Sequence, residues 1–337
     1  MKKKAAKIIL LAALLVLASL TLYGCGEDAG SSADDRLSEI YLETGEYLSE
    51  QAEQTPPGVN SIGGEWLVIG LTRSGVGLPG DCREAYMNTA KEYIEANIDE
   101  NGRLHKAKST DNSRVILALT ALGEDASDID SYDLIAGLSD MDYVKMQGTN
   151  GPIWALIALD SNGYEIPANT AGGEQVTREK LVECILSLQL EDGGWNLTGE
   201  SADTDMTAMA IQSLAPYYET DNQVKASVDE AVECLSQMQS SDGGYSSWGS
   251  LSSESCAQVI VALTSLGIDP HADERFIKDG GSVIDALLTF HDEDGGFRHT
   301  ADDEVNGMST EQAYYAMASY YRMKEGKTPL YDMSDAA

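Results

Sequence analysis

One short loop, present in three copies, decides the fold: Gln-Leu-Glu-Asp-Gly-Gly-Trp at 189–195, Gln-Ser-Ser-Asp-Gly-Gly-Tyr at 239–245 and His-Asp-Glu-Asp-Gly-Gly-Phe at 291–297. The aspartates Asp192, Asp242 and Asp294 recur every 50 to 52 residues. A period of this size indicates a repeat architecture in which each copy is one supersecondary unit. The paired glycines allow a sharp turn, and the aromatic residue after them can fill the gap between neighbouring units.

Each loop joins two segments that have the apolar periodicity of helices. The helices before the loops are longer and charged on one face, which predicts an outer layer: 178–188, 224–238 and 281–290. The helices after the loops are small and apolar, which predicts an inner layer: 206–218, 255–266 and 310–321.

More degenerate helix pairs precede these three: 37–51 with 66–74, 81–97 with 111–122, and 132–146 with 152–160. No segment alternates convincingly as a strand. The prediction is an all-α fold of about six helix pairs. Six pairs can close into an α/α toroid, a barrel of six inner and six outer helices, or stay open as a solenoid.

Repeats that end in Gln-x-x-Asp-Gly-Gly-aromatic resemble those of the terpenoid cyclase and protein prenyltransferase superfamily. The resemblance covers roughly residues 37–323 and implies an α/α toroid. Similar toroids carry complement-type thioester domains and the helical domain of cobalamin carriers. Because one fold hosts unrelated chemistries, function has to be judged from the site residues.

The chain begins with the features of a bacterial lipoprotein signal. A basic start precedes an uncharged, mostly apolar run of 15 residues at 8–22, which is too short for a comfortable membrane span. Leu-Tyr-Gly-Cys at 22–25 resembles a lipobox, and this implies that Cys25 becomes the lipidated first residue. An uncleaved anchor helix is the alternative. We expect a signal peptide at 1–24, a polar tether at 25–36, the toroid at 37–325 and a loosely packed C-terminal tail without function at 326–337.

Without the signal peptide the chain has 18 basic and 56 acidic residues, a net charge of −38. Such a body repels nucleic acid and diphosphates, because no basic cluster offsets the charge. Four further cysteines form no C-x-x-C pair: Cys82, Cys184, Cys234 and Cys256. We expect buried thiols, although an extracytoplasmic location permits disulfides.

The inner helices should all begin on the same side of the ring, so that their first turns surround one mouth. Residues expected to line this mouth and bind a ligand are Glu65, Trp66, Asp111, Asn112, Arg114, Asn150, Trp154, Asp203, Asp205, Thr207, Glu254, Glu311 and Gln312. Helix capping explains most of them singly, since polar side chains at helix starts accept backbone N–H bonds. Taken together, they predict a polar pocket with an aromatic lining.

The stretch Asp203-Thr-Asp205-Met206-Thr-Ala is similar to the Asp-x-Asp-Asp-Thr-Ala motif of class II terpene cyclases. The resemblance puts Asp205 in the place of the general acid and Asp203 in that of a neighbouring carboxyl. Met206 replaces the third Asp. Protonation of an alkene needs an unusually strong acid in a dry cavity, so the lost carboxyl argues against this reaction.

The protein prenyltransferases hold zinc with an Asp, a Cys two residues later and a distant His. Glu254 and Cys256 have this spacing, but the inner helix at 310–321 offers no His. Since a catalytic zinc needs three protein ligands, we expect no metal and no cofactor. A Cys-Gly-Glu-Gln stretch for a thioester is also absent from the sequence.

We therefore expect a non-enzymatic binding module, tethered through Cys25 to the extracytoplasmic face of a Gram-positive-type cell membrane. It would hold a small molecule or a peptide in the toroid mouth. The resemblance to cobalamin carriers makes a corrinoid one candidate; these carriers close over it with a second domain, so a partner protein could complete the site here. The alternatives are an extracellular terpene cyclase- or mutase-like enzyme with Asp205 as general acid, and a structural or adhesive surface scaffold.

Overall fold

The computed structural model describes residues 31–247 and 249–336 of the 337-residue chain. The predicted signal peptide at 1–24 and the lipidated Cys25 lie outside these residues. The chain divides into two compact units, Met1–Ser38 and Glu39–Ala337. The fold described below is that of the second unit.

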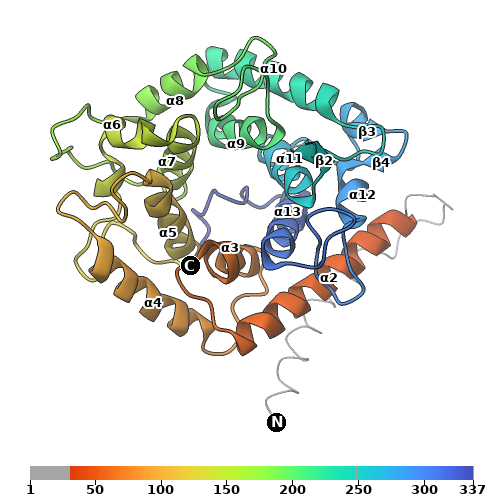
Figure 1. The fold of residues 1–337 in the computed structure, drawn as a ribbon, viewed down its shortest axis with the longest axis horizontal. Coiled ribbons are helices and arrows are strands. Elements are labelled where there is room, and N and C mark those ends of the chain that lie inside the picture. The colour runs from red at the N-terminus through yellow and green to blue at the C-terminus, as the bar shows by residue number, and fades with distance from the viewer. Residues whose placement is uncertain (1–30, 248, 337) are drawn as a thin grey trace. The chain divides into compact units, whose positions relative to one another are not determined.

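Two layers of helices make up this unit (Figure 1). The inner layer consists of α3 (Trp66–Arg73), α5 (Ser109–Ala121), α7 (Asn150–Asp160), α9 (Thr204–Leu214), α11 (Ser253–Ser265) and α13 (Gly307–Lys324). The outer layer consists of α2 (Ser31–Gln54, from Glu39 onward in this unit), α4 (Cys82–Asn97), α6 (Met141–Val144), α8 (Arg178–Ser187), α10 (Asn222–Met238) and α12 (Val283–Leu288). Short helical turns lie at Ser61–Glu65, Ala136–Leu138, Lys145–Gln147, Ala215–Tyr217 and Glu274–Phe276.

The inner helices form a closed ring. Each packs against the next along the chain, and α13 packs against α3. Neighbouring inner helices run parallel. Glu65 and Arg114 join the starts of α3 and α5, and Arg73 and Arg322 join the ends of α3 and α13. The predicted all-α toroid is confirmed, and the open solenoid is excluded.

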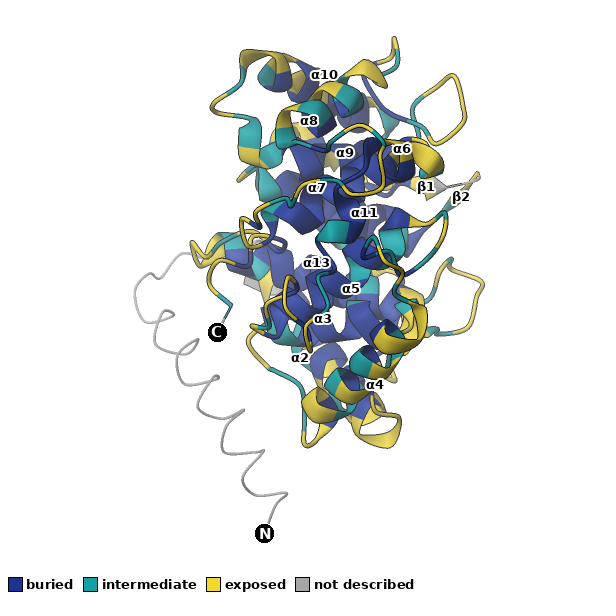
Figure 2. Ribbon diagram, turned by 90° about the vertical axis from the view of Figure 1, so that its left-hand side faces the viewer, coloured by how far each residue is buried: buried dark blue, intermediate teal, exposed yellow. Residues whose placement is uncertain are grey.

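Burial explains the composition of the two layers. The inner helices lie between the lumen and the outer layer, and α7 is apolar on all sides with Gly151–Leu159 buried throughout. The outer helices and the loops carry the exposed residues (Figure 2). The all-round apolar character of α7 therefore follows from its place in the ring.

The repeated loop has a left-handed first glycine and a buried aromatic residue in all three copies. Its first glycine is left-handed, with φ of 87° at Gly193, which favours glycine over any side chain. A Cβ on Gly194 would lie 2.4 Å from the Cβ of Ala202, so the chain passes too closely for a side chain. The aromatic residue is fully buried in every copy: Trp195, Tyr245 and Phe297. The indole of Trp195 also donates to the carbonyl of Ile185 at 2.7 Å, which ties the loop to its outer helix.

Three details differ from the sequence predictions. The predicted outer helix at 132–146 is wrong, because 139–141 pairs with 174–176 through backbone hydrogen bonds and leaves only α6 as an α-helix there. Two hairpins of two-residue strands, β1 (Ser246–Ser247) with β2 (Ser250–Leu251) and β3 (Ile277–Lys278) with β4 (Gly281–Ser282), lie in the loops. Helix α2 begins at Ser31, inside the expected tether.

The prediction of a loosely packed tail is also wrong. Residues 328–335 return across the end of the ring where the inner helices finish (Figure 1). Arg73, in the last turn of α3, donates to the carbonyls of Leu330 and Asp332 at 3.0 and 2.7 Å. Arg73 and Arg322 each contact the carboxylate of Asp335 at 2.5 Å. Two buried guanidinium groups thus fix the segment in place.

Candidate functional site

We name the two ends of the ring by the inner helices: they begin at the helix-start rim and finish at the helix-end rim. Asp203 caps α9 at the helix-start rim, where its carboxylate accepts the N–H of Met206 at 2.9 Å. Asp205 lies in the first turn of α9, where its Oδ1 atom is buried and the Ser255 hydroxyl is its hydrogen-bonding neighbour. Burial raises the pKa of Asp205 to about 6, and the charges of Asp203 and Glu254 act in the same direction.

Glu254 lies beside Asp205 and has two hydrogen-bonding neighbours of its own. His299 Nδ1 lies 2.6 Å from its Oε2 atom, and the Ser309 hydroxyl donates to Oε1 at 2.7 Å. Burial alone would raise the pKa of Glu254, but the hydrogen bonds from Ser309 and His299 outweigh burial and lower the pKa. The structure therefore brings Asp203, Asp205 and Glu254 together at the helix-start rim.

A second group at the same rim joins α3, α5 and α13. Glu65 is fully buried, with Oε2 3.1 Å from Arg114 Nε. Glu311 accepts the N–H of Gly63 at 2.8 Å, while its other oxygen is buried with no hydrogen bond from the residues the structure describes. Burial raises the pKa of Glu311 to about 7, and the nearby Glu65 adds to the effect. Arg114 also lies 3.9 Å from Asp111.

Two predicted mouth residues serve the fold. Asn112 is fully buried, accepts the N–H of Leu104 at 2.9 Å and donates to the carbonyls of Gly102 and Leu134. Thr207 is fully buried and accepts the N–H of Trp195 at 2.9 Å. Their polar atoms hold neighbouring loops, so neither side chain is open to a ligand. Asn150 is half-buried at the start of α7.

Aromatic side chains fill part of the lumen. Trp66 and Trp154 come from α3 and α7, which are separated by α5, yet their ring centroids are 5.3 Å apart. Tyr315 of α13 lies 6.0 Å from Trp66, and Tyr331 of the C-terminal segment lies 5.9 Å from Trp154. The predicted aromatic lining is thus a cluster that meets across the ring.

A row of amides crosses the other half of the lumen. Gln212 of α9 donates to the carbonyl and the side-chain oxygen of Gln258, both at 3.0 Å. Gln258 of α11 donates to Gln312 at 3.0 Å and to the Tyr315 hydroxyl at 2.7 Å. The predicted Gln312 therefore belongs to this row.

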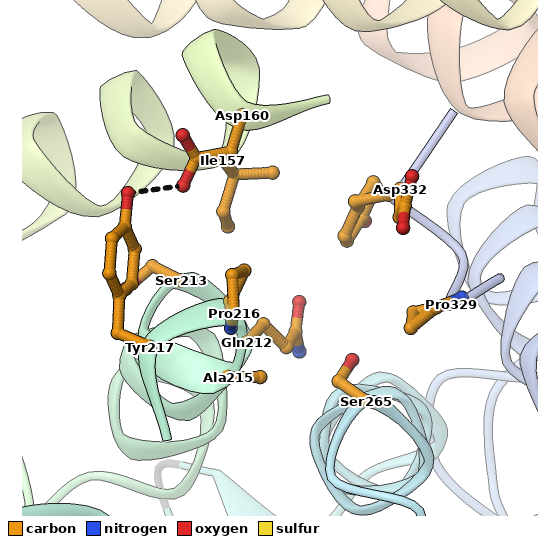
Figure 3. Close-up of a pocket in the computed structure, with 11 residues that line it drawn as sticks. Ile157, Asp160, Gln212, Ser213, Ala215, Pro216, Tyr217, Ser265, Pro329 and Asp332 are labelled. Atoms are coloured by element: carbon orange, nitrogen blue, oxygen red, sulfur yellow. Dashed lines mark hydrogen bonds between the residues drawn. The ribbon is translucent and has the colours of Figure 1, made fainter. Parts of the chain in front are cut away.

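A pocket of about 450 Å³ lies at the helix-end rim, opposite the predicted mouth (Figure 3). Its lining comes from α7, α9, the turn after α9, α11 and the C-terminal segment: Ile157, Asp160, Gln212, Ser213, Ala215, Pro216, Tyr217, Ser265, Pro329, Tyr331 and Asp332. Figure 3 shows the Gln212 amide pointing into the space between α9 and the C-terminal segment. None of the predicted site residues lines this pocket.

Gln212 is the most informative of the lining residues. Its side chain is 5% exposed, and its Oε1 atom accepts no hydrogen bond from the part of the chain that the structure describes. A buried acceptor without a partner costs free energy unless a bound group or water satisfies it. In the sequence, the long polar side chain of Gln212 within the mostly apolar inner helix 206–218 was a signal for this site. Nothing in the sequence placed Tyr331 or Asp332 beside it.

Among the described residues no group of three or more His, Cys, Asp and Glu side chains could hold a metal ion. Cys82, Cys184, Cys234 and Cys256 are free thiols in the structure, with Cys184 half-buried and the other three buried. Within residues 31–247 and 249–336, no helix is long and apolar enough to span a membrane.

Comparison with known proteins agrees with this architecture. A family model described as the prenyltransferase alpha-alpha toroid domain matches residues 102–269. The chain carries this domain and belongs to the terpenoid cyclase and protein prenyltransferase toroid superfamily. None of the curated protein sequences matches the chain significantly.

Solved structures share the fold at low identity. An ent-copalyl diphosphate synthase from Streptomyces platensis is 21% identical with a TM-score of 0.50 over 76% of this chain, which spans 49% of that enzyme. The type II terpene cyclase MstE from Scytonema, in a complex with its product merosterolic acid A, is 14% identical with a TM-score of 0.54; the match covers 87% of this chain and 99% of that enzyme. A protein from Actinoplanes is 13% identical with a TM-score of 0.51, over 83% of this chain and 98% of that protein. These likenesses establish the fold and leave the activity open.

Proposed function

We propose that the protein is a non-enzymatic, lipid-anchored binding module that takes a small molecule or a peptide segment into the pocket at the helix-end rim. Two observations support this proposal: the pocket itself, and the lining residue Gln212, whose buried Oε1 atom has no hydrogen-bond donor among the described residues. Small-molecule sites commonly measure roughly 300–1,000 Å³ and combine apolar walls with a few polar groups. The pocket has this character. A corrinoid would fit only in part.

The helix-start rim supports a ligand site less well. Asn112 and Thr207 are committed to backbone contacts, and Glu65 and Arg114 are paired with each other. Four acidic residues are partly exposed there, Asp111, Asp203, Asp205 and Glu254, and Glu254 is paired with His299. We therefore place the ligand at the opposite end from the mouth that the sequence suggested.

The terpene cyclase alternative depends on Asp205 as a proton donor. A carboxyl with a pKa of about 6 is mostly ionised at neutral pH, and Met206 supplies no second carboxyl to keep it protonated. Trp66, Trp154 and Tyr315 also occupy lumen space that an isoprenoid would need. These observations favour binding without turnover.

Thermal unfolding of the purified protein with a ligand panel tests the proposal. The panel contains amines, peptides, corrinoids and isoprenoids, since isoprenoids would be the substrates of a cyclase-like enzyme. A ligand at about a hundredfold over its dissociation constant stabilises by roughly 2.7 kcal/mol and raises the midpoint by several degrees.

Two variants localise the site. Ser265→Leu fills the pocket and should abolish the shift, whereas Ser187→Leu should not, because Ser187 makes the same kind of local hydrogen bond on the exposed face of α8. A ligand-induced rise in the unfolding midpoint that persists in Ser265→Leu and disappears in Asp205→Asn would refute the proposed location. It would place the ligand at the helix-start rim instead. Consumption of an isoprenoid, lost in Asp205→Asn, would establish the enzyme instead.

The anchor is tested separately. We expect Cys25→Ser to release the protein from the membrane fraction, because lipidation needs the thiol of that residue. Metabolic labelling with a fatty acid should mark the wild type and leave Cys25→Ser unlabelled, and Cys82→Ser serves as a matched control with the label retained. Equal membrane association of all three proteins would contradict the anchor at Cys25.

A further inference from the structure

We infer that the pocket at the helix-end rim selects an organic cation: an ammonium group carried on a short apolar body. The inference rests on the proposed function, because it names the class of ligand for the same pocket. Three independent features of the lining favour a positively charged ligand. They are the helix ends, the carboxylate of Asp332, and the acceptor of Gln212 beside aromatic rings.

The helix ends supply a negative potential. Helix α7 ends at Asp160, α9 at Leu214 and α11 at Ser265, so three helices direct their carbonyl ends toward the pocket. The C-terminal end of a helix carries roughly half a negative charge. No Lys or Arg is among the described lining residues. Arg178 lies behind the wall at the end of α7, where it contacts Asp160 and the carbonyl of Leu159, so the ends of α9 and α11 supply the negative potential that remains.

The two carboxylates of the lining are not equivalent. Asp160 is compensated, because Arg178 Nε lies 2.6 Å from its Oδ1 atom and the Tyr217 hydroxyl donates to Oδ2. Asp332 accepts hydrogen bonds from Ser334 and remains exposed. Arg73 contacts the main-chain carbonyl of Asp332, while its ion pair is with Asp335. Asp332 is therefore the carboxylate available to a cation.

The buried side of the pocket offers acceptors and rings. Gln212 Oε1 is an acceptor without a donor among the described residues, and an ammonium group is a donor without acceptor capacity. Tyr217 and Tyr331 supply aromatic faces, which attract cations through the ring quadrupole. The described lining also holds hydroxyl groups and the Gln212 amide, but no positively charged side chain that could pair with an anion, and an uncharged ligand would gain little from the helix ends.

Three probes with one skeleton test the inference: phenylpropylamine, phenylpropanol and phenylpropanoate. They present an ammonium, a hydroxyl and a carboxylate on the same apolar body. Calorimetric titration of the full-length protein should give an amine affinity about tenfold above that of the alcohol, with no measurable binding of the carboxylate. Ser265→Leu should abolish binding of the amine.

A charge variant identifies the contact. Asp332→Asn should lower the affinity for the amine by about fivefold and change the affinity for the alcohol by less than about twofold, because only the amine interacts with the carboxylate. Asp302→Asn removes an equal charge from an exposed loop outside the pocket and should leave both affinities unchanged. The preference for the amine should therefore shrink in the first variant alone.

The remaining outcomes separate the two claims. Equal affinities for alcohol and amine, both lost in Ser265→Leu, would overturn the cation preference and leave the pocket as a binding site. Failure of the amine to bind at millimolar concentration would also overturn the preference, while a panel ligand of another class that Ser265→Leu abolishes would still uphold the proposed function. Amine binding that survives Ser265→Leu would refute the inference altogether.

Discussion

At the residue level, two buried carboxyl groups make the charge of the helix-start rim depend on pH. Glu311 and Asp205 have pKa values of about 7 and about 6 in the folded protein, both raised chiefly by burial. Each group binds its proton more tightly when folded than when unfolded. Their contribution to stability is therefore fully present below the unfolded pKa and is lost as the pH rises through the folded pKa.

Glu311→Gln tests this assignment. The amide oxygen of Gln can still accept the N–H of Gly63, but the group no longer ionises. We expect the wild type to lose about 1–3 kcal/mol of unfolding free energy relative to the variant between about pH 4.5 and about pH 7.5. Urea unfolding across this range measures the difference, and Glu50→Gln on the exposed face of α2 is the control. Parallel pH profiles for wild type and Glu311→Gln would contradict the raised pKa.

At the level of elements, the inner helix and the loop before it form one unit. The first turn of α9 offers the Thr207 hydroxyl to the N–H of Trp195, and the first turn of α13 offers Thr310 to the N–H of Phe297, both at 2.9 Å. The caps repeat as well, since Asp203 and Asn306 accept the N–H three residues later. The polar residues at these helix starts therefore hold the aromatic loop as well as capping the helix.

We expect Thr207→Val to destabilise the fold by about 1–3 kcal/mol, because the N–H of Trp195 is left buried without an acceptor. Thr207→Ser keeps the hydroxyl and should recover most of the loss. Thr289→Val removes an exposed hydroxyl that bonds only within its own turn, and it should change little. Urea unfolding at one pH compares the three variants. A loss in Thr207→Val no larger than that in Thr289→Val would show that the contact is unimportant.

At the level of the whole toroid, residues 328–335 close the ring at the helix-end rim and complete the pocket. Burial alone would raise the pKa of Asp335, but hydrogen bonds from Arg73 and Arg322 outweigh burial and lower the pKa to about 2. The ion pairs therefore stabilise the segment above the unfolded pKa of Asp335, near 3.9, and this contribution is lost as the pH falls toward 2.

Asp335→Asn should loosen the C-terminal segment without unfolding the ring. We expect a loss of about 1 kcal/mol, discounted because the carboxylate is partly exposed. Hydrogen exchange should accelerate at the amide of Met333, which donates to the carbonyl of Ser161 at 2.7 Å, and stay unchanged in the middle of α7. Asp302→Asn is the control. Unaltered exchange at Met333 in Asp335→Asn would show that the arginine contacts do not hold the segment.

The fold was predictable from sequence because the repeated loop joins each helix pair to itself and to the next pair. Gly194 and Trp195 contact Ala202 and Ile185 of their own pair, while Gly193 lies against Glu230 of the next outer helix, so the recurring motif indicates the toroid. The pocket joins residues from 157 to 332, and no local pattern indicates that Tyr331 meets Trp154. The residues at the helix-start rim could be listed from sequence because helices begin with polar side chains. Such side chains indicate helix capping as readily as ligand binding.

The most direct test of the central claim is the position of a bound ligand in crystals of the protein, grown with the panel ligand that raises the unfolding midpoint most. We expect electron density at the helix-end rim, between Gln212 and Asp332 and beneath the C-terminal segment. Density at the helix-start rim, beside Asp205 and Glu254, would show that the ligand binds at the other end of the ring.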